Sequence, residues 1–274
     1  MGILVCPICK KELNKIDKKE ICENNHSFDY AKEGYLNLHI SKNSKNPGDD
    51  KVMVNSRREF LDKGFYAEIS EKVNELLKAN ITIGDKLLDV GAGEGYYTNK
   101  MAKALNEVEV FALDISKEAV KKGAKTYKNI KWLVASGLEE PFKDKSFKGI
   151  TVLFSKLFSK EFKRVLDDEG FLIVVSPNRE HLVDIKKVVY PMIKYENIEP
   201  IDELKDDFEL VKRENLFYKK AVHGEDIKNL FHMTPYRWKS PKDGVERLES
   251  LNYLEVTVDV NVDVYRKKRS EEHT

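Results

Sequence analysis

GDKLLDVGAGEGYYTNKMAKAL, residues 84–105, carries the pattern that decides the fold of this chain. An apolar stretch ends in three glycines, Gly91, Gly93 and Gly95, and is followed by apolar residues at helical spacing, among them Met101. This order of strand, glycine turn and helix is typical of the first unit of a parallel sheet that binds a nucleotide-like ligand. We expect the turn to lie at the carboxyl end of its strand, where such folds bind their ligands.

The glycine spacing disfavours a dinucleotide. The turn has the pattern G-x-G-x-G instead of G-x-G-x-x-G, and Glu94 places a carboxylate where a pyrophosphate would be repelled. S-adenosylmethionine, a cationic ligand with an amino-acid tail, tolerates that carboxylate. Asp89 and Asp114 lie near the ends of two successive apolar stretches, and an acid about twenty residues beyond the glycines accepts hydrogen bonds from ribose hydroxyls. We therefore expect S-adenosylmethionine as cofactor, bound at the glycine turn that begins with Gly91 and with its ribose hydroxyls at Asp114.

Strand and helix patterns alternate beyond the glycine unit. Strand patterns cover 130–136, 147–154 and 170–177, and helical patterns cover 117–127 and 159–166. Such alternation indicates an α/β fold, a parallel sheet covered by helices on both faces. Ser136, just beyond one of the predicted strands, is placed to meet the adenine edge of the cofactor.

The region near the carboxyl terminus predicts a reversed strand pair that completes the sheet. Residues 254–264 alternate apolar and polar side chains, which indicates a half-buried antiparallel strand. A helical pattern opens after Gly224. Tyr236 and Trp238 are candidates either for stacking on a base or for a place in the core or in a lid.

The segment ahead of the glycine unit changes from polar to helical. Residues 41–55 contain a Pro-Gly pair and are predicted to be a linker. Apolar residues then recur at helical spacing from Ser56 to Leu77, which predicts a helix. Arg57 and Arg58 of this helix either contact RNA phosphates or belong to a solvated face.

The chain has three cysteines, and all of them lie near the amino terminus. Cys6 and Cys9 have two residues between them, and Cys22 and His26 have three. Two tight turns of this kind present three thiolates and one imidazole to a tetrahedral ion, and zinc fits that donor set. Four protein ligands leave no open position for water, so we expect a structural site. Ordinary buried thiols are the alternative, which the spacing disfavours.

Charge and composition limit the possible partners. Lys and Arg number 48 against 47 Asp and Glu, so any nucleic-acid surface must be a local patch. The favoured patch is the lysine-rich surface around the cysteines, made of Lys10, Lys11, Lys15, Lys18 and Lys19. No apolar stretch is long enough for a membrane span, no signal peptide is evident, and an odd cysteine count favours reduced thiols. We expect a folded cytoplasmic protein with no membrane segment.

Several longer motifs accompany the cysteine spacing and the glycine turn. AKEGYLNL (31–38) follows the cysteines, RREFLDKGFY (57–66) precedes the glycine turn, and MTPYRW (233–238) lies near the carboxyl terminus. Together they resemble the bacterial 23S ribosomal RNA guanine-N1 methyltransferases over nearly the whole chain. One difference is LFSKLFSKEF (153–162), which lacks the proline and cysteine expected in the loop that approaches the target base.

The resemblance implies a fold, that of a Rossmann-like class I methyltransferase with a small N-terminal zinc-binding domain. It also implies a reaction and a set of ligands. It implies a zinc-binding domain at 1–40, a linker at 41–55 and a methyltransferase domain at 56–274, assembled as a homodimer. It implies methylation of N1 of a guanine in a hairpin loop of 23S ribosomal RNA. It also implies zinc at Cys6, Cys9, Cys22 and His26, and cofactor contacts at Tyr66, Gly93, Glu94 and His181.

The sequence identifies no catalytic residue. Guanine N1 carries a proton at neutral pH, so some group must accept that proton or stabilise the oxygen at position six of the base. Ser155, Lys156 and Ser176 are candidates near strand ends, with help from Glu94. Two alternative functions are open: a methyltransferase for a small molecule or a protein, and a non-catalytic zinc-dependent RNA-binding protein.

Overall fold

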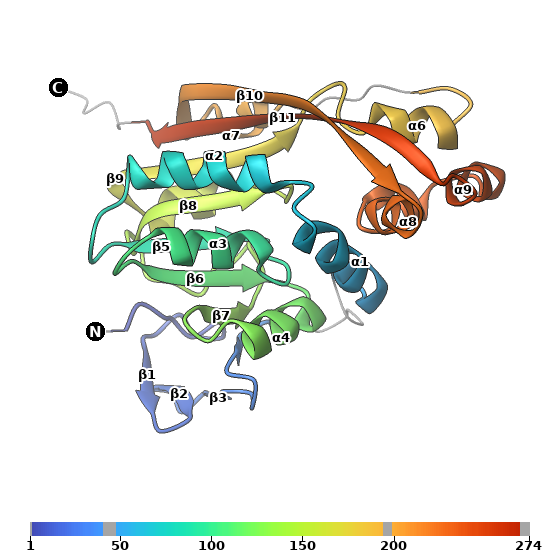
Figure 1. The fold of residues 1–274 in the computed structure, drawn as a ribbon. Helices are drawn as coiled ribbons and strands as arrows, with labels where there is room; N and C mark the ends of the chain where they lie inside the picture. The colour runs from blue at the N-terminus through green and yellow to red at the C-terminus, as the bar shows by residue number, and fades with distance from the viewer. Residues whose placement is uncertain (1, 41–47, 194–198, 269–274) are drawn as a thin grey trace.

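The computed structural model describes residues 2–40, 48–193 and 199–268, and its central layer is one large β-sheet (Figure 1). Within these residues the strands follow the order β10-β11-β9-β8-β5-β6-β7-β4. The strands are β4 (Leu36–Asn37), β5 (Lys86–Val90), β6 (Glu109–Asp114), β7 (Lys131–Val134), β8 (Phe147–Leu153), β9 (Leu166–Pro177), β10 (Phe208–His223) and β11 (Tyr253–Lys267). Strands β4 to β9 run parallel, whereas β11 is antiparallel to both of its neighbours. The predicted α/β fold with a closing reversed strand pair is confirmed.

Two hydrophobic clusters cover the two faces of the sheet. Most helices contribute to one cluster: α1 (Lys51–Asp62), α2 (Ala67–Lys78), α3 (Tyr96–Ala104), α4 (Lys117–Thr126), α6 (Val183–Val189), α8 (Glu225–His232) and α9 (Lys242–Glu249). The other cluster has α5 (Ser159–Val165), α7 (Pro200–Leu204) and residues from the amino terminus, among them Leu13. None of the helices in the described ranges combines the length and apolar character needed to span a bilayer.

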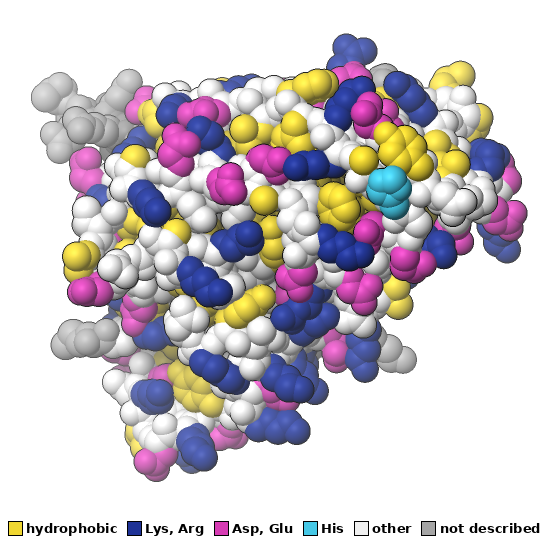
Figure 2. All heavy atoms as spheres, viewed as in Figure 1, with side chains coloured by type: hydrophobic (Ala, Val, Ile, Leu, Met, Phe, Trp, Pro, Cys, Tyr) yellow, Lys and Arg dark blue, Asp and Glu magenta, His cyan; other side chains and the backbone are white. Residues whose placement is uncertain are grey.

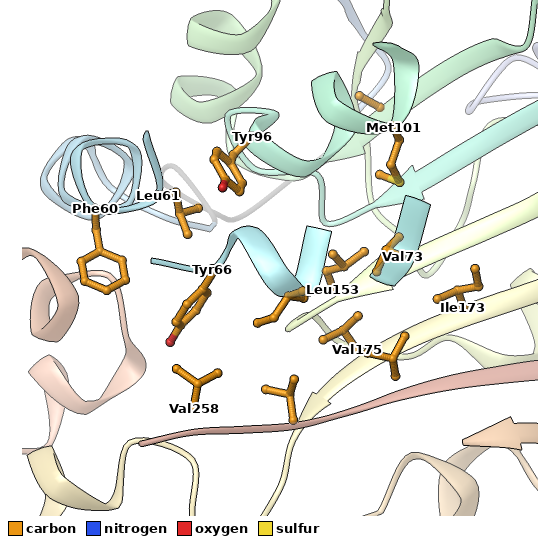
Figure 3. Packing of buried hydrophobic residues seen from close by; sticks show 14 of the residues in the cluster. Phe60, Leu61, Tyr66, Val73, Tyr96, Met101, Leu153, Ile173, Val175 and Val258 are labelled. Carbon is orange, nitrogen blue, oxygen red and sulfur yellow. The ribbon is translucent and has the colours of Figure 1, made fainter. Parts of the chain in front are cut away.

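The glycine unit folds as predicted and forms the centre of the first cluster. β5 leads through the glycines into α3, and Met101 of that helix is fully buried. Figure 3 shows Val73 of α2 between Met101 and Ile173 of β9. α2 and α3 therefore pack together on the sheet, and α3 begins directly after the glycine turn.

The helix predicted from Ser56 to Leu77 is in fact two helices. The first, α1, already begins at Lys51, because the side chain of Asp50 accepts a backbone N–H of the first turn at 2.9 Å. The chain then turns at Gly64, whose φ of +80° is readily adopted only by glycine, before α2 begins. The prediction of one helix was wrong since the apolar spacing continues across this turn.

β11 is a central strand, and the prediction that it would be half-buried was wrong. Every residue from Val256 to Tyr265 is buried, because β10 and β9 pair with its two edges and both faces are covered. The buried polar residues have hydrogen-bond partners on neighbouring elements. Arg213 of β10 donates two hydrogen bonds of 2.8 Å to Asp263, and Asp259 accepts others from neighbouring segments. The alternation of apolar and polar residues in β11 therefore distinguishes an apolar face from a hydrogen-bonded polar face, and both faces are buried.

The N-terminal ribbon (residues 2–30) is joined to the large sheet. It contains a small antiparallel sheet of β1 (Leu13–Ile16), β2 (Lys19–Cys22) and β3 (Ser27–Asp29). A backbone bridge between Leu4 and Phe142 and the pairing of β4 with β7 connect it to the rest of the chain. The division at 1–40, 41–55 and 56–274 stays a prediction, and residues 41–47 lie outside the described residues.

Candidate functional site

Four predicted metal ligands converge in the N-terminal ribbon. The sulfurs of Cys6, Cys9 and Cys22 and Nδ1 of His26 lie within 4.8 Å of one another. Nδ1 is 3.5 Å from two of the sulfurs, and two sulfurs are 3.7 Å apart. A tetrahedral zinc ion with bonds of about 2.3 Å to sulfur and about 2.0 Å to nitrogen has edges of about 3.8 and 3.5 Å. A backbone N–H at Lys11 lowers the pKa of Cys9 to about 6, which favours the thiolate.

Two backbone turns present these ligands. The N–H of Lys10 donates to the carbonyl of Cys6 at 2.8 Å, and the N–H of Asn25 donates to the carbonyl of Cys22 at 2.9 Å. Lys10 and Asn25 both have φ of 59°, in the left-handed region. Asparagine tolerates that conformation better than most residues, so the sequence at the second turn favours the geometry that the site needs.

A cleft of about 500 Å³ lies at the carboxyl ends of β5, β8 and β9. Its walls are the glycine turn, the start of α3, the loops after β8 and β9, and residues 233–236. Five of the predicted cofactor contacts line it: Tyr66, Gly91, Gly93, Glu94 and His181. Asp114 and Ser136 are not among the lining residues.

The glycines of the turn have different roles. Gly91 and Gly93 both have positive φ, 74° and 58°. A Cβ atom on Gly91 would lie 2.1 Å from the hydroxyl of Ser155, so packing within the protein requires a glycine. A Cβ atom on Gly93 would have its nearest neighbour, Arg57, at 3.6 Å. The space beside Gly93 is therefore open for a ligand to approach the backbone.

Asp114 ties the glycine turn to the end of β6. Its two carboxylate oxygens accept the backbone N–H groups of Gly93 at 2.8 Å and Ser116 at 2.7 Å. Burial raises the pKa of Asp114, and these two hydrogen bonds oppose that rise. Ser136 accepts a backbone N–H from Leu138 in its own turn at 3.2 Å, and its contact with adenine stays a prediction.

Tyr66 and His181 meet in the cleft, 3.4 Å apart at the hydroxyl and Nε2. Nδ1 of His181 accepts the backbone N–H of Asp259, so the ring hydrogen is on Nε2 and points at Tyr66. Burial lowers the pKa of His181 to about 3 and raises the pKa of Tyr66 above its usual range. Both rings are therefore neutral at physiological pH. In Figure 3 the ring of Tyr66 points from the start of α2 toward Val258 of β11.

Two arginines of α1 lie beside the glycine turn. Arg57 lines the cleft, forms an ion pair with Asp49 and donates to the carbonyl of Met233 at 3.2 Å. Arg58 lies 3.6 Å from the carboxylate of Glu94. Burial raises the pKa of Glu94, and the positive charge of Arg58 opposes that rise. Both arginines thus have protein partners around the cleft, where the sequence left RNA contact or a solvated face open.

Asp89 connects elements inside the sheet and does not line the cleft. It accepts hydrogen bonds from Thr98 of α3 at 2.5 Å and from Thr151 of β8 at 2.9 Å. Burial raises its pKa to about 6. Asp89 lies at the end of β5 as predicted, one residue before Val90, but its carboxylate is held by Thr98 and Thr151 inside the fold.

Further predicted and unpredicted residues line the cleft. Ser155, Lys156 and Ser176 line it, as candidates for the proton-accepting group should. Phe154 and Tyr97 line the cleft without having been predicted. The ring of Phe154 stacks on His181 with centroids 5.8 Å apart. Phe154 is the last residue of a predicted strand and Tyr97 lies at the start of a helix, and these positions are the signals that the sequence offered.

Two segments of the chain match known families. Residues 4–45 match the family described as RlmA, N-terminal, and residues 87–170 match the family described as Methyltransferase domain. A putative 23S rRNA (guanine-N(1)-)-methyltransferase of Micromonospora griseorubida is 30% identical over 201 residues, which cover 66% of this chain and 68% of that protein. The chain belongs to the 23S rRNA (guanine-N1)-methyltransferase family.

Two further relatives of this family match almost end to end. The putative 23S rRNA (guanine-N(1)-)-methyltransferase YxjB of Bacillus subtilis (strain 168) is 28% identical over 267 residues, 94% of each chain. The 23S rRNA (guanine(748)-N(1))-methyltransferase of Streptomyces fradiae is 28% identical over 270 residues, 96% of each chain. The resemblance drawn from the motifs is confirmed.

Zinc and S-adenosylmethionine are the predicted cofactors, and both fit this family member. The spacing of the four ligand atoms matches a tetrahedral zinc ion, and residues 4–45 match the family's N-terminal segment. The cleft lies next to the glycine turn of the methyltransferase domain and has the volume of a cofactor site. Buried oxygens that line it, on Glu94 and Tyr97, have no hydrogen-bond partner among the described residues, as expected beside a polar ligand.

Proposed function

We propose that this chain transfers the methyl group of S-adenosylmethionine to N1 of a guanine in a hairpin loop of 23S ribosomal RNA. The observation that carries the proposal is the match over 96% of the chain to the Streptomyces fradiae protein, whose name specifies this atom. N1 lies on the pairing edge of guanine, so the enzyme must take an unpaired loop base or turn a paired base out of its helix.

The proposed cofactor contacts surround the glycine turn. Gly93 gives the ligand close access to the backbone, and Asp114 keeps further lone pairs for the ribose hydroxyls. Tyr66 and His181 form a neutral pair beside the tail of the cofactor. The complete proposed set is Tyr66, Gly91, Gly93, Glu94, Asp114, Ser136 and His181.

The residues at the acceptor end would handle the proton of guanine N1. S-adenosylmethionine supplies an electrophilic methyl group when bound. Ser155, Lys156 and Ser176 border the space that the base would enter. A group there accepts the N1 proton or stabilises negative charge on O6, and Phe154 offers a partly exposed ring against which the base can pack.

The N-terminal ribbon is proposed as the RNA platform, with zinc at Cys6, Cys9, Cys22 and His26. Figure 2 shows Lys and Arg side chains gathered over α4 and the ribbon below it. Lys10 and Lys11 form ion pairs with Glu139 at 3.5 Å and Glu23 at 3.0 Å, all with mainly exposed side chains. Exposed pairs contribute little stability, so RNA phosphates can replace these carboxylates at small cost.

Assembly and location complete the proposal. We propose a homodimer, on the family resemblance, and a division into domains at 1–40, 41–55 and 56–274. The proposed location is the cytoplasm, where thiols stay reduced and available to zinc. Light scattering of the purified chain tests the dimer.

The deciding experiment maps the methyl group on the RNA. Primer extension on ribosomal RNA from cells with and without the gene should show one stop that depends on the gene, and nucleoside mass spectrometry should identify 1-methylguanosine. Radiolabelled donor incubated with ribosomal RNA, with cell protein or with small metabolites separates the three acceptor classes. Label in protein or metabolites alone would overturn the RNA assignment, and failure to bind S-adenosylmethionine in calorimetry would favour a non-catalytic RNA-binding protein.

A further inference from the structure

The guanidinium of Arg57 forms a wall of the cleft above the glycine turn. One of its nitrogens, Nη1, is ion-paired with Asp49 and lies 3.6 Å from the Cβ position at Gly93. The other, Nη2, donates to the carbonyl of Met233. The side chain is 27% exposed, so this is a partly buried cation at the point where the proposed cofactor passes the backbone of the turn.

Tyr97 offers an unused hydrogen bond in the same cleft. Its hydroxyl oxygen is buried, and it has no hydrogen-bond partner among the described residues. Burial raises the pKa of Tyr97 well above its ordinary value, and the charge of Arg57 opposes that rise, so the two groups lie within electrostatic reach. Buried hydroxyls in native proteins almost always have hydrogen-bond partners. A buried hydroxyl without a protein partner in a ligand cleft therefore indicates that a ligand atom is its partner.

These two groups match an anion, and the proposed cofactor carries one. We infer that Arg57 and Tyr97 bind the α-carboxylate of S-adenosylmethionine and thereby hold its amino-acid tail in place. A guanidinium donates charge-assisted hydrogen bonds to carboxylates, and Arg57 already pairs with one carboxylate through Nη1, that of Asp49, which the carboxylate of the cofactor would join or replace. The start of α3 beside Tyr97 adds a favourable dipole. The inference rests on the proposed function only for the identity of the cofactor.

The test compares two cofactor analogues by calorimetry on the full-length zinc-loaded chain. Decarboxylated S-adenosylmethionine differs from S-adenosylmethionine by the loss of the carboxylate. The Arg57→Gln variant should bind S-adenosylmethionine on the order of 10- to 100-fold more weakly, as expected for a lost charge-assisted hydrogen bond. Its affinity for the decarboxylated analogue should be unchanged or higher, so the preference for the carboxylated ligand is lost.

Three further variants separate this role from general effects. Arg57→Gln combined with Asp49→Asn removes the carboxylate that the single change leaves unpaired, and should still lack the preference. Lys186→Gln removes one positive charge beside Tyr236, another residue that lines the cleft, and should keep the preference. Tyr97→Phe, which removes only a hydroxyl, should weaken the preference about tenfold or less.

Two results would overturn the inference. Equal losses for both ligands in Arg57→Gln would mean that Arg57 supports the fold of the cleft and not the carboxylate. Unchanged affinity for both ligands with a raised KM for RNA would place Arg57 at the acceptor. The affinities for the two cofactor analogues do not depend on which molecule is methylated, so absence of a methyl group on ribosomal RNA would refute the proposed function and leave this inference standing.

Discussion

Nδ1 of His181 accepts the backbone N–H of Asp259 at 3.3 Å, which connects a predicted cofactor residue to the middle of β11. The bond sets the tautomer and aims Nε2–H at Tyr66. β11, which was predicted to be only half-buried, therefore orients His181, a cofactor residue that the resemblance implied. Because the ring is buried and neutral, the bond also has a consequence for the dependence of stability on pH.

His181 should make the protein less stable in mild acid. Its pKa is about 3 in the folded state against 6.5 for an ordinary histidine, so its contribution is fully present above pH 6.5 and is lost as the pH falls toward 3. The free energy of unfolding in urea should fall by about 2 kcal/mol between about pH 7.5 and pH 5 through this group alone. His181→Asn, which keeps an acceptor near the position of Nδ1, should remove that part of the pH dependence.

The control for this prediction is His223→Gln, since His223 is exposed on the edge strand β10. It should leave the pH dependence as it is in the wild type. Identical slopes for the wild type and His181→Asn would mean that the imidazole is accessible to protons in the folded state.

The α/β fold was predictable because the spacing of apolar residues within a short window distinguishes strands from helices, and the two patterns alternate along this chain. The glycine turn, Asp114 and the metal ligands follow from short spacings of the same kind. Arg57 and Phe154 were not predictable as cleft residues, since their positions depend on contacts with Met233 and His181, which lie far away along the chain. The packing of the N-terminal ribbon on the sheet also depends on contacts between distant parts of the chain, so it was not predictable either.

Loss of zinc should destabilise more than the N-terminal ribbon. Cys6 and Cys22 belong to the same buried cluster as Phe142 of the large domain, so an opened ribbon uncovers part of the sheet. Cys22→Ser or treatment with a chelator should lower the midpoint of thermal unfolding by on the order of 10 °C. Calorimetry and metal analysis measure the two effects. His39→Gln, outside the ligand set, should retain one zinc per chain, and a Cys22→Ser variant that did so would contradict the proposed ligands.

Two glycines of the turn should respond differently to the same substitution. Gly93→Ala has room for its Cβ and should cost about 1 to 2 kcal/mol for its left-handed backbone, while weakening S-adenosylmethionine binding more than about tenfold. Gly91→Ala adds a collision with Ser155 and should cost about 1 to 3 kcal/mol more.

Ser155→Gly combined with Gly91→Ala should recover the part of the stability that the collision removed. Urea denaturation gives the stabilities, and titration calorimetry gives the affinities. If Gly93→Ala bound the cofactor as well as the wild type does, the ligand would not approach the backbone at this glycine.

The pairing of Arg213 with Asp263 should matter more for stability than an exposed pair on the same strand. Asp263 is fully buried and accepts both hydrogen bonds from the guanidinium, so Arg213→Met leaves a buried carboxylate with only the hydroxyl of Tyr265. We expect a loss of about 2 kcal/mol, below the usual range for a buried pair because Arg213 is partly solvated. Asp263→Asn in that background should restore part of it, since an amide needs no countercharge.

Lys219→Met is the matched control for this pair. Lys219 is ion-paired with Glu255 at 2.8 Å, also between β10 and β11, but both side chains are about half exposed, 54% and 50%. Its removal should leave the free energy of unfolding nearly unchanged, because solvent already screens the pair. Equal losses for the two variants in urea denaturation would show that burial on β11 does not strengthen its polar contacts. A larger loss for Arg213→Met would mean that the charged hydrogen bonds to Asp263 stabilise the β10–β11 pair in addition to the backbone hydrogen bonds between the strands.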